Sequence, residues 1–100
     1  MGSNRSPDAI AVAALTPDEA AGIICSLDWE CDRAMRVAYC ESRFVAEATN
    51  KAGPYIGLFQ VWDRHVEEPW MLYDPIYNTQ IAYQLWLERG WRPWPVCGAR

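Results

Sequence analysis

The chain has 100 residues, which is enough for one compact domain and too few for two. Its 51% hydrophobic and 22% charged residues exclude a disordered tail as a description of the whole chain. Its formal charge of -4 excludes the net basic field of a nucleic-acid-binding domain. The longest apolar stretch, residues 9–15, is far shorter than the roughly 20 residues of a membrane-spanning helix. We therefore expect a soluble single domain that binds no nucleic acid and spans no membrane.

Residues 1–15 are rich in alanine and show no clear amphipathic period, so we expect a flexible N-terminal arm. No charged lead-in followed by a long apolar region is present, so no intact signal peptide is visible. If the protein is exported, Met1 to Asn4 would be an introduced start that replaces a removed signal.

The first predicted helix covers residues 17–27. Thr16 supplies a capping hydroxyl, Pro17 stands at the first helical position, and Glu19 completes a capping box. Apolar side chains recur at helical spacing, at Ala20, Ile23, Ile24 and Leu27. This pattern predicts a short helix with one buried face.

The second predicted helix covers residues 29–42, with Asp28 or Asp32 as its cap. One stripe of this helix carries Ala34, Val37, Ala38 and Glu41. A carboxylate is unexpected at the end of such a stripe. The negative end of the helix dipole and burial would both raise the pKa of Glu41, as a general acid near neutral pH requires, unless Arg43 folds back over it. The alternative is that Glu41 projects into water at the helix end.

The remaining chain divides into a turn at 49–54, an extended segment or small hairpin at 55–62, and an irregular stretch at 67–73. Asp74 and Pro75 then open a helix over 75–89, which Gly90 ends. The buried face of this helix is predicted at Ile81, Ala82, Leu85 and Trp86. Residues 91–97 follow as a stiff aromatic tail.

Four cysteines, an even set in a short chain, favour two disulfides and an oxidising compartment. A zinc site is one alternative, but no two cysteines stand about two to four residues apart, and the only histidine is His65. Four free buried thiols are the other alternative. Of three possible pairings we favour Cys25–Cys31 with Cys40–Cys97, which would stabilise the fold by about 2 and about 4 kcal/mol on the loop-entropy model.

The chain is also rich in aromatic residues, with six tryptophans and five tyrosines. Their faces stack well on sugar rings, which favours a sugar-binding groove. The alternative is that they compensate for a small core.

Four short motifs resemble known families. Cys40-Glu41-Ser42 and the segment from Gly57 to Val61 resemble the first two motifs of soluble lytic transglycosylases and goose-type lysozymes, within the lysozyme-like superfamily. Gln80-Ile81 and the Gly-Trp-Arg-Pro-Trp-Pro-Val-Cys ending at Cys97 resemble the tail of resuscitation-promoting factors. The resemblance covers roughly residues 20 to 98. In the last family the flanking cysteines are bridged, which supports Cys40–Cys97.

The resemblance implies a lysozyme-like catalytic domain over 16–100 that cleaves the β-1,4 bond between N-acetylmuramic acid and N-acetylglucosamine in peptidoglycan. It makes Glu41 the catalytic acid, places Ser42 near the acetamido sugar and places Gln60 on the groove floor. The candidate substrate-binding residues are Ser42, Tyr55, Gln60, Asp63, Tyr83 and Trp94.

The sequence departs from the family patterns at the second acid. Tyr55 and Ile56 occupy the region where chicken-type lysozymes carry an aspartate, and Asp63 is displaced by one position from the goose-type aspartate. The late Ala-Tyr-Asn-x-Gly motif is absent, and Tyr83 lies in a fragment of it, where we favour core packing over a hydrogen bond to Glu41. With a single acid, formation of a 1,6-anhydro product is favoured over hydrolysis.

The predicted fold is therefore α+β and mainly helical, a lysozyme-like domain with a small β element stapled by two disulfides. We expect a monomer that is secreted, or held in the cell wall or periplasm, and that binds peptidoglycan glycan strands without a metal or other cofactor. The alternatives are a glycan-binding module without turnover and a disulfide-stapled interaction protein.

Overall fold

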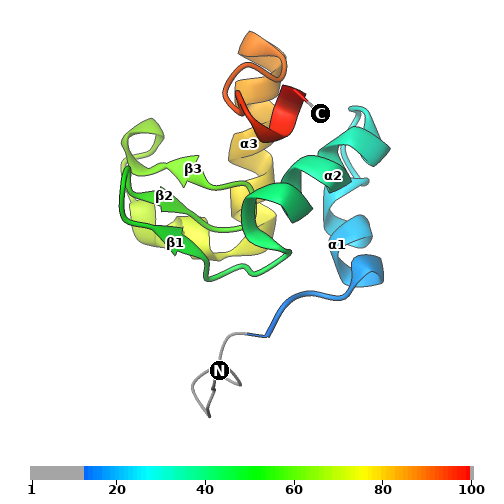
Figure 1. Ribbon diagram of the computed structural model, residues 1–100, viewed down its shortest axis with the longest axis horizontal. Helices are drawn as coiled ribbons and strands as arrows, with labels where there is room; N and C mark the ends of the chain where they lie inside the picture. The colour runs from blue at the N-terminus through cyan, green and yellow to red at the C-terminus, as the bar shows by residue number, and fades with distance from the viewer. Residues whose placement is uncertain (1–12, 100) are drawn as a thin grey trace.

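The structure is a computed structural model in which residues 13–99 are described, and it has the predicted α+β character (Figure 1). Its α-helices are α1 (Pro17–Ile24), α2 (Cys31–Ser42) and α3 (Pro75–Arg89), and its strands are β1 (Thr49–Asn50), β2 (Tyr55–Ile56) and β3 (Val61–Trp62). Short 3₁₀ helices cover Asp63–His65, Pro69–Tyr73 and Cys97–Ala99. Most of the predicted N-terminal arm, residues 1–12, lies outside the described residues. The end of that segment contacts the fold, because the N–H of Leu15 donates to the carbonyl of Phe44 at 2.9 Å.

Helix α1 begins as predicted but ends earlier. Its capping box is present, with reciprocal hydrogen bonds between Thr16 and Glu19. The prediction that the helix continues to residue 27 is wrong, because Cys25 forms a disulfide with Cys31 across a Cα–Cα distance of 5.0 Å. Six residues of continuous helix would separate these Cα atoms by about 9 Å along the axis, so the chain turns between them.

Helix α2 begins at Cys31, two residues later than predicted, and its N-cap is Glu30. Neither Asp28 nor Asp32 caps it, so that part of the prediction is wrong. The reason lies at Trp29, which enters the core and donates its indole N–H to the carbonyl of Ile24 at 2.8 Å. The helix ends at Ser42, as predicted.

Helix α3 matches both predicted bounds. The Asp74 side chain accepts a hydrogen bond from the N–H of Ile76 at 2.9 Å, and Gly90 ends the helix at φ +63°. Ala82 and Leu85 are buried as predicted, whereas Ile81 and Trp86 are half-buried.

The predicted segment 55–62 is a small antiparallel hairpin, in which β2 pairs with β3 in the register Tyr55 with Trp62 and Ile56 with Val61. The turn predicted at 49–54 also contains a strand that the sequence did not indicate, since β1 pairs with β2. The stretch 67–73, predicted as irregular, contains the 3₁₀ helix Pro69–Tyr73.

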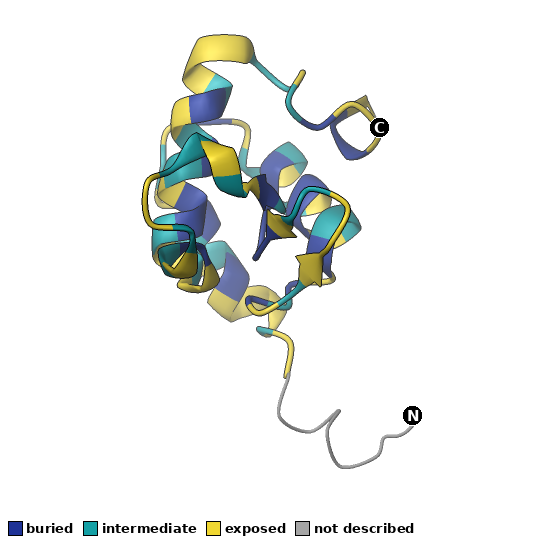
Figure 2. Ribbon diagram, turned by 90° about the vertical axis from the view of Figure 1, so that its left-hand side faces the viewer, coloured by how far each residue is buried: buried dark blue, intermediate teal, exposed yellow. Residues whose placement is uncertain are grey.

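The two favoured disulfides are both present, so all four cysteines are bridged. The Cys40–Cys97 bond joins α2 to the C-terminal segment. That segment packs through its aromatic residues, because Trp91 stacks on Trp29 with ring centroids 5.7 Å apart and Trp94 donates to the carbonyl of Phe59 at 2.9 Å. Figure 2 shows buried positions on the inner faces of the helices and exposed positions on their outer faces. No helix within residues 13–99 is long and apolar enough to cross a membrane.

A single buried amide joins α3 to the hairpin. The side chain of Asn78 accepts from the N–H of Phe59 at 2.9 Å and donates to the carbonyls of Ile56 and Leu72 at 2.8 and 2.9 Å. Gly57 lies against it at φ +82°, where an added Cβ would stand 2.3 Å from the Asn78 amide nitrogen. The hairpin turn is therefore held by Asn78 in a shape that requires glycine.

We expect Asn78→Ala to lower the free energy of unfolding by about 3 kcal/mol, because it leaves three buried backbone groups without partners. Chemical denaturation would measure the difference. Gln84→Ala, which removes an exposed amide from the same helix, is the control and should change stability little. Equal stability of the two variants would contradict this role for Asn78.

Candidate functional site

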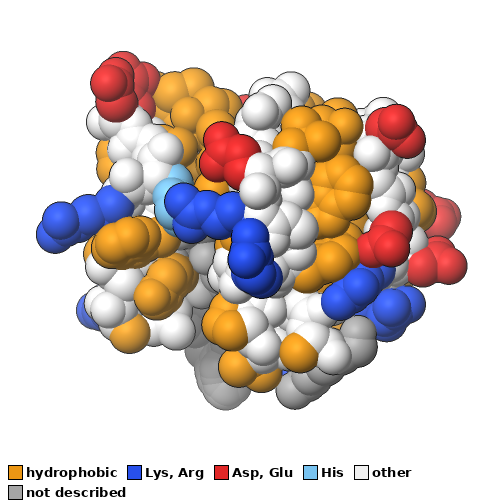
Figure 3. All heavy atoms as spheres, turned by 90° about the horizontal axis from the view of Figure 1, so that it is seen from above, with side chains coloured by type: hydrophobic (Ala, Val, Ile, Leu, Met, Phe, Trp, Pro, Cys, Tyr) orange, Lys and Arg blue, Asp and Glu red, His pale blue; other side chains and the backbone are white. Residues whose placement is uncertain are grey.

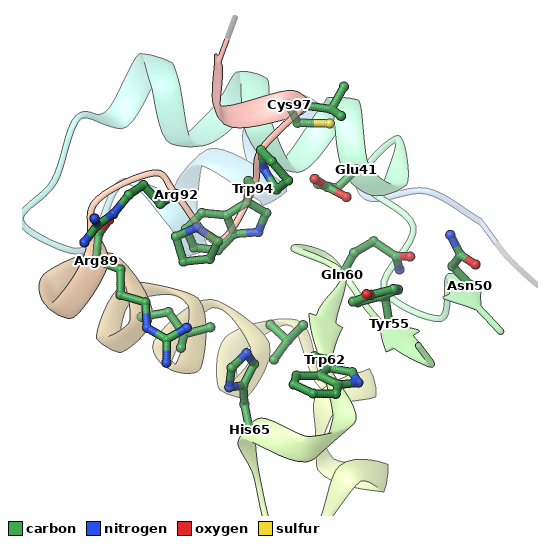
Figure 4. A pocket seen from close by; sticks show the side chains of 15 residues that line it. Glu41, Asn50, Tyr55, Gln60, Trp62, His65, Arg89, Arg92, Trp94 and Cys97 are labelled. Carbon is green, nitrogen blue, oxygen red and sulfur yellow. The ribbon is translucent and has the colours of Figure 1, made fainter. Parts of the chain in front are cut away.

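A pocket of about 550 Å³ lies where the end of α2, the sheet, the end of α3 and the C-terminal segment meet (Figure 4). This volume is within the usual range of small-molecule sites. Its lining residues are Glu41, Asn50, Tyr55, Gln60, Val61, Trp62, His65, Leu85, Arg89, Arg92, Pro93, Trp94, Pro95, Val96 and Cys97.

Glu41 lies in the last turn of α2 and is half-buried in this pocket. Desolvation by burial raises the pKa of its carboxyl group above the ordinary value. Arg43 does not fold back over it, since its guanidinium lies 4.7 Å from the centre of the Tyr39 ring. Among the described residues no ion pair neutralises Glu41, so its surroundings favour the protonated acid.

Ser42, although adjacent to Glu41, has a different environment. It is buried and is not among the residues that line the pocket. Its hydroxyl lies 2.7 Å from the carbonyl of Leu58 and 3.1 Å from that of Ala38. Its hydrogen bond to Leu58 therefore links the end of α2 to the hairpin turn.

Gln60 occupies the last position of the hairpin turn, at φ +52°, and its side chain lines the pocket with Glu41 (Figure 4). Its amide nitrogen donates to the carbonyls of Ala48 and Gly57 at 3.1 and 3.0 Å. These bonds fix the side chain and leave its carbonyl oxygen as the atom available to a ligand.

Aromatic side chains form two walls of the pocket. Tyr55 and Trp62 are direct cross-strand neighbours, each about two-fifths exposed (39% and 40%). Trp94 lies opposite them in Figure 4 and is almost completely buried. The hairpin pair can therefore present its ring faces to a ligand, whereas Trp94 serves mainly as a wall.

The structure places two candidate residues away from the pocket. Asp63 does not line it, and the buried Oδ1 of Asp63 has no hydrogen-bond partner among the described residues. Tyr83 packs against Trp29 and Trp86, at centroid distances of 5.5 and 5.9 Å, as the packing interpretation predicts.

Five further polar or aromatic lining residues were not predicted from the sequence: Asn50, Trp62, His65, Arg89 and Arg92. They belong to separate elements, and no local spacing relates them to Glu41. Burial lowers the pKa of His65, and the charge of Arg89 lowers it further while Glu88 raises it. The one signal in the sequence that could have indicated any of them is the presence of two arginines beside the Trp-Pro tail of an acidic chain.

Comparisons of the chain with protein-family models, with curated proteins and with solved structures found no match. A half-buried carboxyl can donate a proton, aromatic faces can stack on a ring, and amides can bind hydroxyls. Within residues 13–99 no group of three His, Cys, Asp or Glu side chains is placed to hold a metal ion.

The raised pKa of Glu41 predicts a pH-dependent effect on stability. Because the folded protein holds this proton more tightly than the unfolded chain, stability falls as the pH rises through the window between the two pKa values. Glu41→Gln removes this loss, so its stability relative to the parent should be greater at about pH 7 than at about pH 4.

Chemical denaturation at both pH values would measure this difference. Glu47→Gln, at an exposed carboxylate outside the pocket, is the control. If the stability of Glu41→Gln differed from that of the parent by the same amount at both pH values, the ionised carboxyl would not be destabilised by its surroundings.

Proposed function

We propose that this protein is a lysozyme-like glycosidase that cleaves the β-1,4 bond between N-acetylmuramic acid and N-acetylglucosamine in peptidoglycan, with Glu41 as general acid and base. The observation that carries the proposal is the Glu41 carboxyl, which is half-buried, has a raised pKa and lines an aromatic pocket with Gln60. Both residues belong to the motifs that resemble the lysozyme-like superfamily.

In the proposed reaction, Glu41 donates its proton to the glycosidic oxygen as positive charge develops at the sugar carbon. A carboxyl whose pKa is raised by burial is suited to this step, since it keeps its proton closer to neutral pH. The tyrosine and tryptophan of the hairpin would stack on the sugars, and the free carbonyl oxygen of Gln60 would accept a hydrogen bond from a hydroxyl or amide group.

The product of the proposed reaction is a 1,6-anhydro sugar. Glu41 is the only carboxylate among the described residues that line the pocket, and Asp63 is not one of them. After the glycosidic bond breaks, the ionised Glu41 can take the proton of the muramyl 6-hydroxyl while that oxygen bonds to the sugar carbon. The reaction then consumes no water and needs no second carboxylate.

The same lack of a second pocket carboxylate favours an alternative function, a module that binds glycan strands without turnover. Titration with chitooligosaccharides that detects binding, together with wall digests that contain no product, would identify such a module. The two disulfides are compatible with an oxidising compartment, and we propose that the protein acts as a monomer at the cell wall, after secretion or in the periplasm.

We expect Glu41→Gln to lose cell-wall clearing while it keeps its fold, because the amide has no proton of suitable acidity to donate. Turbidity of a cell-wall suspension measures clearing, and circular dichroism checks the fold. Glu47→Gln is the matched control and should clear walls at the parent rate. Clearing by Glu41→Gln at the parent rate would overturn the assignment of the acid.

Mass spectrometry of digested peptidoglycan separates the two reaction outcomes. Anhydro ends are one water lighter than the reducing ends formed by hydrolysis. We expect anhydro ends from the parent protein, and reducing ends alone would require a second group that positions water.

A further inference from the structure

The net charge of the residues that line the pocket is opposite in sign to the net charge of the whole chain. The chain has a formal charge of -4, but the charged residues that line the pocket are Glu41, Arg89 and Arg92. Even with Glu41 ionised, two guanidinium groups outnumber one carboxylate, so the pocket is a positively charged site in an acidic protein. Such segregation calls for an explanation, because clefts lined by one sign of charge attract ligands of the opposite sign.

The two arginines are positioned together by the end of α3. Arg89 stands in its last turn, and the Nε of Arg92 donates to the carbonyl of Arg89 at 3.2 Å. Among residues 13–99 the only recorded ion pair joins Arg33 to Glu30, so no described carboxylate lies within 4.0 Å of either pocket arginine. A favourable interaction with the helix dipole accounts for Arg89 at this end, but not for two guanidinium groups beside one pocket.

The arginines lie away from the acid. In Figure 4, Arg89 and Arg92 are on the far side of Trp94 from Glu41. Figure 3, seen from above relative to Figure 1, shows basic side chains beside the only histidine, His65. A ligand that spans the pocket would therefore meet a proton donor at one end and positive charge at the other.

We propose that Arg89 and Arg92 form an anion subsite, which binds a carboxylate of the peptide attached to the glycan strand. This inference rests on the proposed function, and it defines the preferred substrate as a peptide-bearing strand. The N-acetylated sugar rings themselves are neutral, so the anion must come from a substituent. Arginine is well suited to this task, because its planar donors match the geometry of a carboxylate.

The peptide is the favoured source of this anion because it is attached to the muramyl unit at the cleaved bond. Its carboxylates therefore come close to the pocket whenever that bond is next to Glu41. A phosphate of a wall polymer has the same chemistry, and the experiment below distinguishes it.

The test compares Arg89→Gln/Arg92→Gln with its parent, both in the Glu41→Gln background so that no probe is cleaved. The probes are a disaccharide that carries the peptide and a neutral chitooligosaccharide, and wall glycan that carries a phosphate polymer is tested alongside them. We expect the double variant to bind the peptide-bearing probe about fivefold to tenfold more weakly and the neutral probe with unchanged affinity. Added salt should weaken only the first interaction.

Arg36→Gln, at an exposed arginine of α2 outside this pocket, is the control and should change neither affinity. Equal binding of the peptide-bearing probe by the double variant and its parent would overturn the inference, and so would equal weakening for both probes. Weakening confined to wall glycan that carries a phosphate polymer would also overturn it, in favour of phosphate. Cleavage of walls by the parent protein is measured separately, so failure of the proposed function is distinguishable from failure of the subsite.

Discussion

The pocket depends on the buried amide of Asn78. From α3 it satisfies one N–H and two carbonyls, which belong to the hairpin and to the 3₁₀ helix that precedes α3. The hairpin turn is thereby held in place, and Gln60 at its end and the aromatic pair on its strands take up their positions along the pocket. Unpaired backbone groups in a core are costly, so this arrangement is strongly preferred over other paths of the short hairpin.

Glu41 and its two neighbours have separate tasks at the end of α2. Cys40 is bridged to Cys97, which brings the Trp-Pro segment over the helix as one wall of the pocket. Ser42 joins the same helix end to the carbonyl of Leu58 on the opposite side. Glu41, between them, makes neither connection and is left with a partly desolvated carboxyl. The Cys-Glu-Ser motif thus combines two structural attachments with one acid, and the attachments on either side hold the acid where burial disfavours its charge.

Besides the acid Glu41, the pocket contains two basic side chains. The end of α3 contributes Arg89 and the following turn contributes Arg92, so a protein that is acidic overall offers a basic pocket end. In the proposed function the sugars contact the aromatic residues and amides, and the attached peptide contacts the arginines. Under this proposal the overall negative charge does not prevent binding of an anionic polymer, because contacts in the pocket are short-range and salt screens the field of the surface.

The sequence by itself determined the elements whose signals are local: the capping box of α1, both ends of α3, an extended segment or small hairpin over 55–62 and the stripe that ends at Glu41. It did not indicate Asn78, two of whose hydrogen bonds reach 19 and 22 residues back to the hairpin, nor the inward turn of Trp29 that delayed the start of α2. The tertiary structure also decided which candidates share a pocket, because Gln60 lines it with Glu41 whereas Asp63, Tyr83 and Ser42 do not. Caps and periodic stripes depend on neighbours a few residues apart and are visible in sequence, but a pocket depends on the packing of separate elements.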